Sequence, residues 1–323
     1  SPRDRVPERI MTDAQIIPPA GPAYLSAAAR AIIEQPIERT AMPPATDADA
    51  WRRRIAEMND DMAGFIAEPR DLPVRSELTH PAGVPTWVAV PDEADRDGPV
   101  QLDIHGGGMI LGAGEVTRIM GEIDAANTGI VHWAVDYRMP PDHPFPAALD
   151  DLIAVYRALL AERDPSQIVV GGGSAGGNLA AALLLRAKAE GLPMPAGLLL
   201  LTPESDLIES GDSFITLKDV SVGMDESLAE VNRLYAAGRD LTDPLLSPLF
   251  GDLRGLPPTL LITGTRDLYL SNTVRMHRAL RDAGVWADLH VFDARPHGGF
   301  GGAPEEEPVQ AEIRAFVRGR VGL

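Results

Sequence analysis

Short strand-like runs, some continuously apolar and some mixed with polar residues, recur along the chain from about residue 76, and turn-forming residues bound most of them. Runs of four to seven residues in this setting are typical of strands with at least one buried face. We expect eight strands from this pattern. They are residues 76–79, 86–90, 100–104, 129–135, 167–170, 197–201, 259–263 and 288–292.

Longer segments with helical periodicity separate the later strands. They lie at residues 147–162, 178–190, 273–283 and 306–318. Strands that alternate with helices favour a parallel sheet, because each crossover must return the chain to the same edge. The pattern therefore predicts an α/β fold with a mostly parallel eight-stranded sheet and helices on both faces.

The first 72 or so residues follow a different pattern, which is helical and punctuated by proline. Within them, residues 51–65 predict an amphipathic helix with apolar positions three and four apart. Its apolar side chains are Trp51, Ile55, Met58, Met62 and Phe65. The run Arg52-Arg53-Arg54 fits the solvated side of the same helix.

A second irregular stretch, residues 204–258, interrupts the alternation of strands and helices. It contains a helical pattern near residues 226–237 and a proline-rich return to the next strand. We interpret residues 1–75 as an N-terminal helical cap segment and residues 76–323 as the main α/β domain. The stretch 204–258 is then an insertion that packs with the N-terminal helices to roof a site.

Composition narrows the function classes. The 323-residue chain has a formal net charge of −18, which argues against nucleic acid or an anionic membrane as its partner. It has no cysteine, so a disulfide, a thiolate nucleophile or a cysteine-ligated metal cannot form. No apolar run is long enough to span a membrane. The first ten residues lack the apolar stretch of a signal peptide, so we expect a cytoplasmic protein.

The run Gly172-Gly173-Ser174-Ala175-Gly176 carries the clearest chemical signal. It lies between a predicted strand and a predicted helix, where Gly-x-Ser-x-Gly forms a nucleophile elbow. The tight turn needs glycines, and it holds the serine at the sheet edge near a helix N-terminus. Glycine-rich turns of this kind also bind phosphates, but no Gly-Lys-Ser/Thr follows here. We therefore expect Ser174 to be a nucleophile.

A second motif, His105-Gly106-Gly107-Gly108, directly follows the predicted strand 100–104. Consecutive glycines cost conformational entropy on folding, which indicates a backbone requirement. The N–H groups of Gly107, Gly108 and Ala175 are the expected oxyanion hole. Met109 and Ile110 follow the motif, and we expect them to help wall an acyl pocket, although ordinary packing explains them nearly as well.

Two further residues complete a triad in chain order. Asp267 lies just past the predicted strand 259–263, and His297 lies in the loop after the last predicted strand. His297 is the expected general base and Asp267 the acid that fixes its tautomer. Asp293 is a rival acid, and position after the penultimate strand favours Asp267. For His105 we expect an orienting role in its loop rather than proton transfer.

With these motifs in place, the chain resembles the hormone-sensitive-lipase-like branch of the α/β hydrolases, known as bacterial family IV. That branch joins an upstream His-Gly-Gly-Gly to a Gly-x-Ser-Ala-Gly elbow, and the stretch 137–151 is also similar. The resemblance covers residues from about 76 to the end. It implies an α/β-hydrolase fold with a helical cap, and hydrolysis of carboxylic esters, usually short-chain ones, without a metal or other cofactor.

The chain departs from that family at two places. The residue before the nucleophile is commonly acidic in the family and is Gly173 here. The run after the acid commonly carries further acidic residues, whereas residues 268–272 read Leu-Tyr-Leu-Ser-Asn. Glycine before the serine is similar to a subgroup that includes lactone hydrolases. The substrate class is therefore open between esters and lactones or amides.

An alternative hypothesis is that the chain is a binding protein on this fold and not an enzyme, since fold does not imply function. Some plant hormone receptors resemble the family but lack the catalytic histidine, whereas Ser174, Asp267 and His297 are all present here. We expect a small ester or lactone as the partner. The sequence leaves a homodimer open, and it does not identify the natural substrate, acyl length or enantiopreference.

Overall fold

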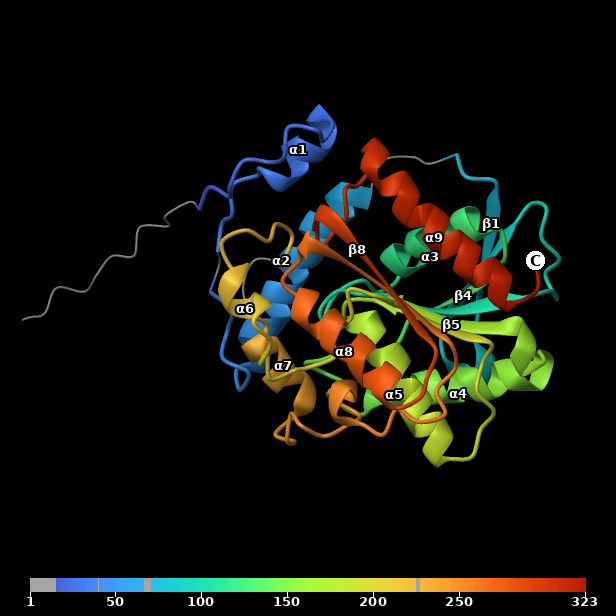
Figure 1. Cartoon of the computed structure of the whole chain (residues 1–323). Helices are drawn as coiled ribbons and strands as arrows, with labels where there is room; N and C mark the ends of the chain where they lie inside the picture. Colours follow the sequence, from blue (N-terminus) through green and yellow to red (C-terminus); the bar gives the residue numbers. More distant parts are fainter. Residues whose placement is uncertain (1–15, 40, 67–70, 225–226) are drawn as a thin grey trace, which may run out of the picture.

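A single eight-stranded sheet organises the part of the chain that the structure describes (Figure 1). The structure is a computed structural model, and it describes residues 16–39, 41–66, 71–224 and 227–323, with the backbone alone for residues 63–66. The strands are β1 Val74–Thr79, β2 Thr86–Pro91, β3 Val100–Ile104, β4 Val131–Val135, β5 Ile168–Gly173, β6 Gly197–Leu201, β7 Thr259–Arg266 and β8 Ala287–Pro296. All eight predicted strands are confirmed.

The strand order in the sheet is β1-β2-β4-β3-β5-β6-β7-β8. β2 pairs antiparallel with β1 and with β4, and every pair from β4 to β8 is parallel. The carboxyl ends of β3, β5, β7 and β8 therefore meet at one edge, where open α/β sheets place their sites. The predicted mostly parallel sheet is thus confirmed.

Helices cover both faces of this sheet, as predicted (Figure 1). α4, α5 and α8 pack on one face in the largest apolar cluster, whereas α9 packs on the other against Val169, Leu199 and Leu260. α3 lies on the same face as α9. In the described residues the helices are α1 Ala27–Ile33, α2 Ala48–Ile66, α3 Glu115–Thr128, α4 Ala147–Glu162, α5 Ala175–Ala189, α6 Ser213–Thr216, α7 Ala229–Ala236, α8 Leu270–Asp282 and α9 Glu307–Arg320.

The sequence pattern did not predict α3. Its buried positions are Thr117, Gly121, Ala125 and Thr128, so the face toward the sheet has helical spacing but no large apolar side chain. Small residues are required there because α3 approaches β4 closely. A Cβ atom added at Gly121 would lie 2.7 Å from the Cβ of Ala134. Periodicity of large apolar residues, which predicts most amphipathic helices, is therefore missing.

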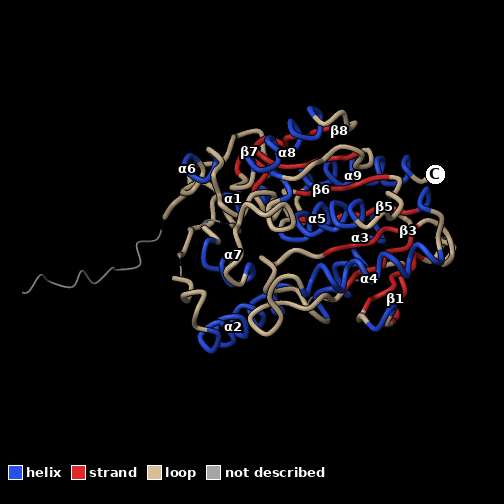
Figure 2. Tube along the Cα trace, turned by 90° about the horizontal axis from the view of Figure 1, so that it is seen from below, coloured by secondary structure: helices blue, strands red, loops and turns tan. Residues whose placement is uncertain are grey.

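The two helices of the N-terminal segment pack at two separate places, whereas we expected the segment to form one cap. α1 packs beside the end of β8, where Ala29 and Ile33 join a buried cluster with Ala294 and Phe300. α2 packs instead with α7 and with the residues after the glycine-rich loop, through Trp51 and its neighbours. Figures 1 and 2 both place α1, α2, α6 and α7 at the same end of the molecule.

Three parts of these segments fall outside the residues that the structure describes. The side chain of Phe65 and the residues before Ile16 are not described, and neither is residue 226, where the helical pattern of the insertion was expected to begin. The described helix of the insertion is α7, Ala229–Ala236.

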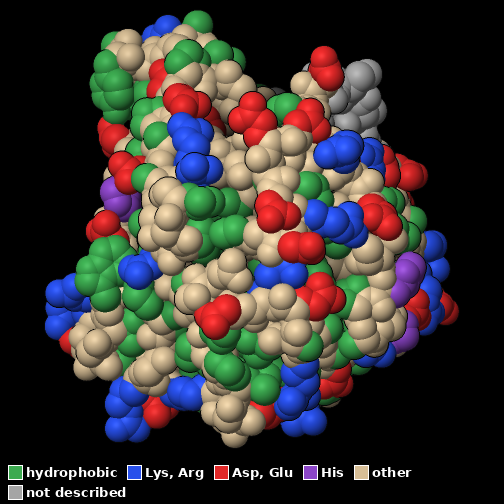
Figure 3. Space-filling view, turned by 90° about the vertical axis from the view of Figure 1, so that its right-hand side faces the viewer, with side chains coloured by type: hydrophobic (Ala, Val, Ile, Leu, Met, Phe, Trp, Pro, Cys, Tyr) green, Lys and Arg blue, Asp and Glu red, His purple; other side chains and the backbone are tan. Residues whose placement is uncertain are grey.

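Charged side chains of both signs alternate on the face shown in Figure 3, with apolar side chains between them. Many of them form ion pairs, such as Arg186 with Asp150 at 2.6 Å and Arg157 with Glu190 at 2.6 Å. Both pairs are partly exposed, so each contributes little to stability. Among the described residues, no helix combines the length and the apolar character that crossing a membrane requires.

Candidate active site

Ser174 stands at a sharp turn between β5 and α5. Its backbone has φ 54° and ψ −120°, a region that costs a non-glycine residue about 1–3 kcal/mol. The turn is held on both sides: the Ser174 N–H donates to the carbonyl of Leu201 at 2.8 Å, and the Asn178 N–H donates to the carbonyl of Ser174 at 3.1 Å. The hydroxyl therefore projects from a fixed backbone rather than from a mobile loop.

Glycines around the serine allow the elbow to touch β3. A Cβ atom at Gly176 would lie 1.9 Å from the carbonyl oxygen of Ile104, and one at Gly172 would lie 2.5 Å from it. Neither position can carry a side chain without moving the backbone. Gly173 differs, because a Cβ there would meet its nearest atoms, on Leu201, at an ordinary 3.7 Å.

His297 and Asp267 complete a continuous chain of hydrogen bonds with the serine. The Nε2 atom of His297 lies 2.9 Å from Ser174 Oγ, and its Nδ1 atom lies 2.8 Å from Asp267 Oδ1. A carboxylate only accepts, so Nδ1 carries the proton and Nε2 is free to accept from the serine hydroxyl. The structure thus brings together the three residues predicted from chain order.

Asp267 is fully buried and firmly oriented. Its carboxylate also accepts from the hydroxyl of Thr263 at 2.9 Å and from the N–H of Tyr269 at 2.9 Å. Asp293, the rival acid, lies elsewhere. It accepts from the hydroxyl of Tyr24 and from that of Thr265 at 3.1 Å, at the outer side of β8.

The glycine-rich loop lies directly beside the elbow. A Cβ at Gly106 would lie 2.9 Å from the carbonyl oxygen of Gly173. Gly107 and Gly108 have φ values of 112° and 61°, and a Cβ at Gly107 would lie 2.3 Å from the carbonyl oxygen of Leu111. Only glycine fits this turn, which brings two backbone amides beside Ser174 and the first turn of α5.

His105 is held inside its loop. Its ring stacks on Tyr137 with centroids 4.2 Å apart, and its Nδ1 atom lies 2.7 Å from the carbonyl oxygen of Gly106. The Tyr137 hydroxyl donates to the His105 carbonyl at 2.7 Å. Burial lowers the pKa of His105 to about 4, so the ring is neutral at neutral pH. This geometry fits the expected orienting role.

A cavity of about 400 Å³ opens over Ser174 and His297. Its walls are mostly apolar and come from the glycine-rich loop, α2, α7 and the loops that flank these helices. The lining residues are Glu38, Met42, Arg54, Met58, Met62, Gly107, Gly108, Ile110, Leu111, Ser174, Gly223, Met224, Leu228, Val231 and His297. Ile110 is among them, as expected. Met109 differs, because it packs in the main core and does not line this cavity.

Two residues near the site carried no sequence signal. Tyr269 packs edge-on against the His297 ring, with centroids 5.0 Å apart. Glu204 is fully buried behind the elbow, where its N–H donates to the carbonyl of Ser174 at 3.1 Å. Burial raises the pKa of the Glu204 carboxyl to about 8, and the negative charge of Glu209 adds to this effect. A buried acid outside any motif is visible only in three dimensions.

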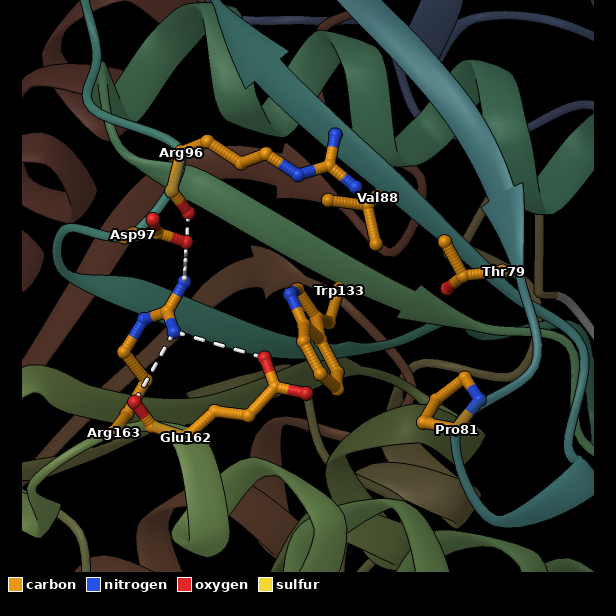
Figure 4. Close-up of a pocket in the computed structure, with 8 residues that line it drawn as sticks. All are labelled: Thr79, Pro81, Val88, Arg96, Asp97, Trp133, Glu162 and Arg163. Atoms are coloured by element: carbon orange, nitrogen blue, oxygen red, sulfur yellow. Dashed lines mark hydrogen bonds and ion pairs between the residues drawn. The ribbon is translucent and has the colours of Figure 1, made fainter.

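A second cavity, lined by described residues, shows no comparable chemistry. It has a volume of about 180 Å³ and lies between β1, β2 and the end of α4, with Trp133 at its side (Figure 4). The Arg163 guanidinium there donates to the carbonyls of Arg96 and Gly98 and lies 3.5 Å from Asp97, so its donors are already used. Within the described residues, no group of three or more acidic, histidine or cysteine side chains could hold a metal ion.

Comparisons with known proteins agree with this geometry. A family model described as the alpha/beta hydrolase fold matches residues 101–300. An acetyl-hydrolase of Streptomyces hygroscopicus is 36% identical over 210 residues, which cover 62% of this chain and 70% of that protein. The crystal structure of an esterase named E25 is 38% identical and superposes with a TM-score of 0.81 over 92% of this chain and 95% of its own. A crystal structure of an esterase from the bacterial hormone-sensitive lipase family is 33% identical, with a TM-score of 0.76 over 88% of this chain and 94% of that esterase.

Proposed function

The chain belongs to the α/β-hydrolase family, in its bacterial hormone-sensitive-lipase-like branch, and on this premise we propose that it hydrolyses carboxylic esters through an acyl-enzyme on Ser174. The observation that carries the proposal is the continuous hydrogen-bond chain from Ser174 through His297 to the buried Asp267. Relatives named as esterases and acetyl-hydrolases support the same reaction class.

In the first half-reaction, Ser174 Oγ attacks the ester carbonyl carbon while His297 Nε2 takes the hydroxyl proton. The carbonyl oxygen becomes an oxyanion. The N–H groups of Gly107, Gly108 and Ala175 are the proposed donors to it, aided by the positive end of α5. Collapse of this intermediate breaks the bond to the alkoxy oxygen, and His297 returns the proton to the leaving alcohol.

In the second half-reaction, water attacks the acyl-enzyme and gives its proton to His297. A second oxyanion forms at the same three amides and then collapses. The acid leaves, and His297 returns the proton to Ser174 Oγ. Asp267 keeps Nδ1 protonated throughout and stabilises the charged ring that forms twice per turnover. The water enters as a reactant, and no other co-reactant is needed.

Substitution of the nucleophile tests this mechanism. Ser174→Ala should lower kcat by about 10⁴- to 10⁶-fold on a p-nitrophenyl ester, with an unchanged circular dichroism spectrum. The exposed Ser166→Ala is the matched control and should keep full activity. A serine-reactive phosphonate should label the wild-type protein and the Ser166 variant once, and leave the Ser174 variant unlabelled. Near-normal turnover by pure Ser174→Ala protein would refute the assignment.

We further propose that α2 and the insertion 204–258 act as the roof over the acyl group. Support comes from the cavity walls, because Met58 and Met62 of α2 line the same cavity as Leu228, Val231 and Ser174 and pack in one apolar cluster with Leu228 and Val231. Methionine side chains are flexible and fill irregular spaces, which suits acyl groups of differing shape.

Filling this space should shorten the acyl preference. Met58→Trp should lower kcat/KM for an octanoate ester about 10-fold more than for an acetate ester, because the added ring occupies the chain's path. Ala56→Trp, on the exposed side of α2, is the control and should leave the ratio unchanged. The same ester series, run beside lactones and amides of similar size, decides which leaving group the enzyme prefers.

We also propose that the protein is cytoplasmic and that its partner is a small molecule. The charge of −18 supports both proposals, because it disfavours binding to nucleic acid and to anionic lipid surfaces. Cell fractionation of the source organism, with an antibody against the protein, tests the compartment, and sedimentation at several concentrations tests whether two chains associate.

A further inference from the structure

The loop that carries His297 crosses over a buried ion pair. β8 ends at Pro296, the loop runs from His297 to Phe300, and a 3-10 turn at Pro304–Glu306 then leads into α9. Beneath it, the Arg295 guanidinium lies 2.8 Å from Glu306, and the two side chains are only 9% and 13% exposed. Arg295 precedes the loop and Glu306 follows it, so the pair closes the loop at its base.

The Glu306 carboxylate binds both ends of this loop. It accepts from Arg295 Nη2 at 2.8 Å and from Arg295 Nε at 3.3 Å. It also accepts from the backbone N–H of Phe300 at 2.7 Å. Charge-assisted bonds of this kind are about twice as strong as neutral ones and fix direction as well as distance.

Gly299 shows how tightly the loop sits on the pair. Its φ is +75°, and a Cβ atom added there would lie 2.9 Å from both Arg295 Nη2 and Glu306 Oε2. The backbone therefore rests directly on the two charged groups. A bulkier residue at this point would lift the loop away from them.

Packing gives the loop little support on its inner side. A polar cavity of about 220 Å³ lies there, between the sheet, α3 and α9, and Gly298, Arg295 and Glu306 all line it. Gly173 lines the same cavity directly before the nucleophile. Phe300 packs in the apolar cluster with Ala29 and Ile33 at the other side of the loop, so on the cavity side the ion pair supplies contacts that packing does not.

Glu306 itself is well anchored. It is the residue before the first turn of α9, where a carboxylate is favoured by the helix dipole. α9 is in turn fixed to the sheet by Val309, Ile313 and Val317, which pack in an apolar cluster with strand residues. Glu306 thus joins the His297 loop to a rigid helix on the face of the sheet opposite α5.

We propose that Glu306, with Arg295 as its counter-ion, is a positioning residue that sets His297 Nε2 at hydrogen-bond distance from Ser174 Oγ. The inference rests on the proposed function, since positioning matters only if His297 acts as the base. Glu306 touches no substrate and acts through the loop alone. A small displacement of a catalytic group lowers kcat strongly but leaves substrate binding nearly unchanged.

The decisive variant is Glu306→Gln, which keeps the shape and removes the charge. We expect kcat to fall about 10- to 100-fold while KM changes less than about threefold. Glu307→Gln is the matched control, because Glu307 is the next residue and its pair with Arg314 is exposed. It should leave both constants unchanged. Equal kcat for the two variants, measured well below their unfolding temperatures, would overturn the proposal.

A second variant separates positioning from stability. Glu306→Gln leaves the buried Arg295 unpaired and should lower Tm. Adding Arg295→Met removes that unpaired charge, so Tm should recover. The loop still lacks its carboxylate clamp in the double variant, so kcat should stay low. Recovery of kcat together with Tm would mean that the pair acts through stability alone, and this would overturn the proposal.

A readout that needs no turnover keeps the two proposals distinguishable. The Nδ1 proton of His297, bonded to Asp267, should give a downfield NMR signal in the wild-type protein and in Glu307→Gln. Glu306→Gln should broaden or shift this signal, and an unchanged signal would refute the inference. If instead Ser174→Ala kept full turnover, the proposed function would fail while the NMR result still decided whether Glu306 positions the ring.

Discussion

Glu204 makes the stability of this protein depend on pH in a way that one substitution should remove. Its side chain is fully buried, and burial raises the carboxyl pKa from 4.5 to about 8. In the unfolded chain the same carboxyl has its ordinary pKa of 4.5. Between these two values the folded protein binds more protons than the unfolded chain, so the free energy of unfolding falls as pH rises. The contribution is complete below about pH 4.5 and is lost above about pH 8.

The size of the effect follows from the two pKa values. A difference of one pKa unit corresponds to about 1.4 kcal/mol, so the interval from 4.5 to about 8 corresponds to roughly 5 kcal/mol. Glu204→Gln keeps the shape and stays neutral at every pH. The variant and the wild type should therefore have similar stability at pH 5. By pH 9 the variant should be the more stable by a few kcal/mol.

Urea unfolding at several pH values between 5 and 9 measures this difference directly. Comparison of variant with wild type at each pH cancels the titration of other groups, such as His105. Glu93→Gln, at an exposed position, is the control and should follow the wild type throughout. A constant difference between the Glu204 variant and the wild type across this range would show that Glu204 is ionised in the folded protein, and would refute the reasoning.

Three further predictions concern the catalytic frame. Asp267→Asn should lower kcat about 10⁴-fold, because an amide favours the wrong tautomer of His297. Asp293→Asn should leave kcat near normal. The opposite ranking of the two variants in a p-nitrophenyl ester assay would identify Asp293 as the acid. Gly176→Ala should abolish soluble expression or activity, because its Cβ would lie 1.9 Å from a carbonyl oxygen. Gly173→Ala has 3.7 Å of clearance, so this variant should fold and should have a Tm within a few degrees of the wild type. The plot of kcat/KM against pH should fall in acid, because a general base must be unprotonated to accept the serine proton, and a flat acid limb would contradict the assignment of His297 as base.

The sheet could be predicted from the sequence because its strands carry their own signals. Residues 100–104 and 197–201 match β3 and β6 in full. The first segment alternates apolar and polar residues, and the second is a short run of leucines after a glycine. The ends of β5 and α5 were harder. The sequence predicts a strand to residue 170 and a helix from 178, whereas β5 continues to Gly173 and α5 begins at Ala175. Glycine has low propensity for both structures, so tertiary contacts with β3 decide its conformation here.

The candidate site likewise contains residues that could be predicted from the sequence and residues that could not. Ser174, His297 and Asp267 could be predicted because each follows a strand, and parallel strands bring their carboxyl ends together. Glu204 and Tyr269 could not, because their roles depend on neighbours far away in the sequence. Glu306 could not, because its pairing with Arg295 depends on how the loop between them folds. Met109 shows the opposite error: it follows the glycine-rich loop in sequence, but with φ 63° its side chain packs in the core.

The contact between the elbow and β3 has a consequence for how this enzyme could change. Gly172 and Gly176 lie against the carbonyl of Ile104, so the distance between nucleophile and oxyanion loop is set by main-chain atoms of the sheet. The walls of the cavity come from side chains of α2 and α7 instead. We therefore expect substitutions in those two helices to alter which acyl group fits without disturbing the chemistry. For directed evolution, a library confined to the methionine positions of α2 should yield new selectivities with few inactive members.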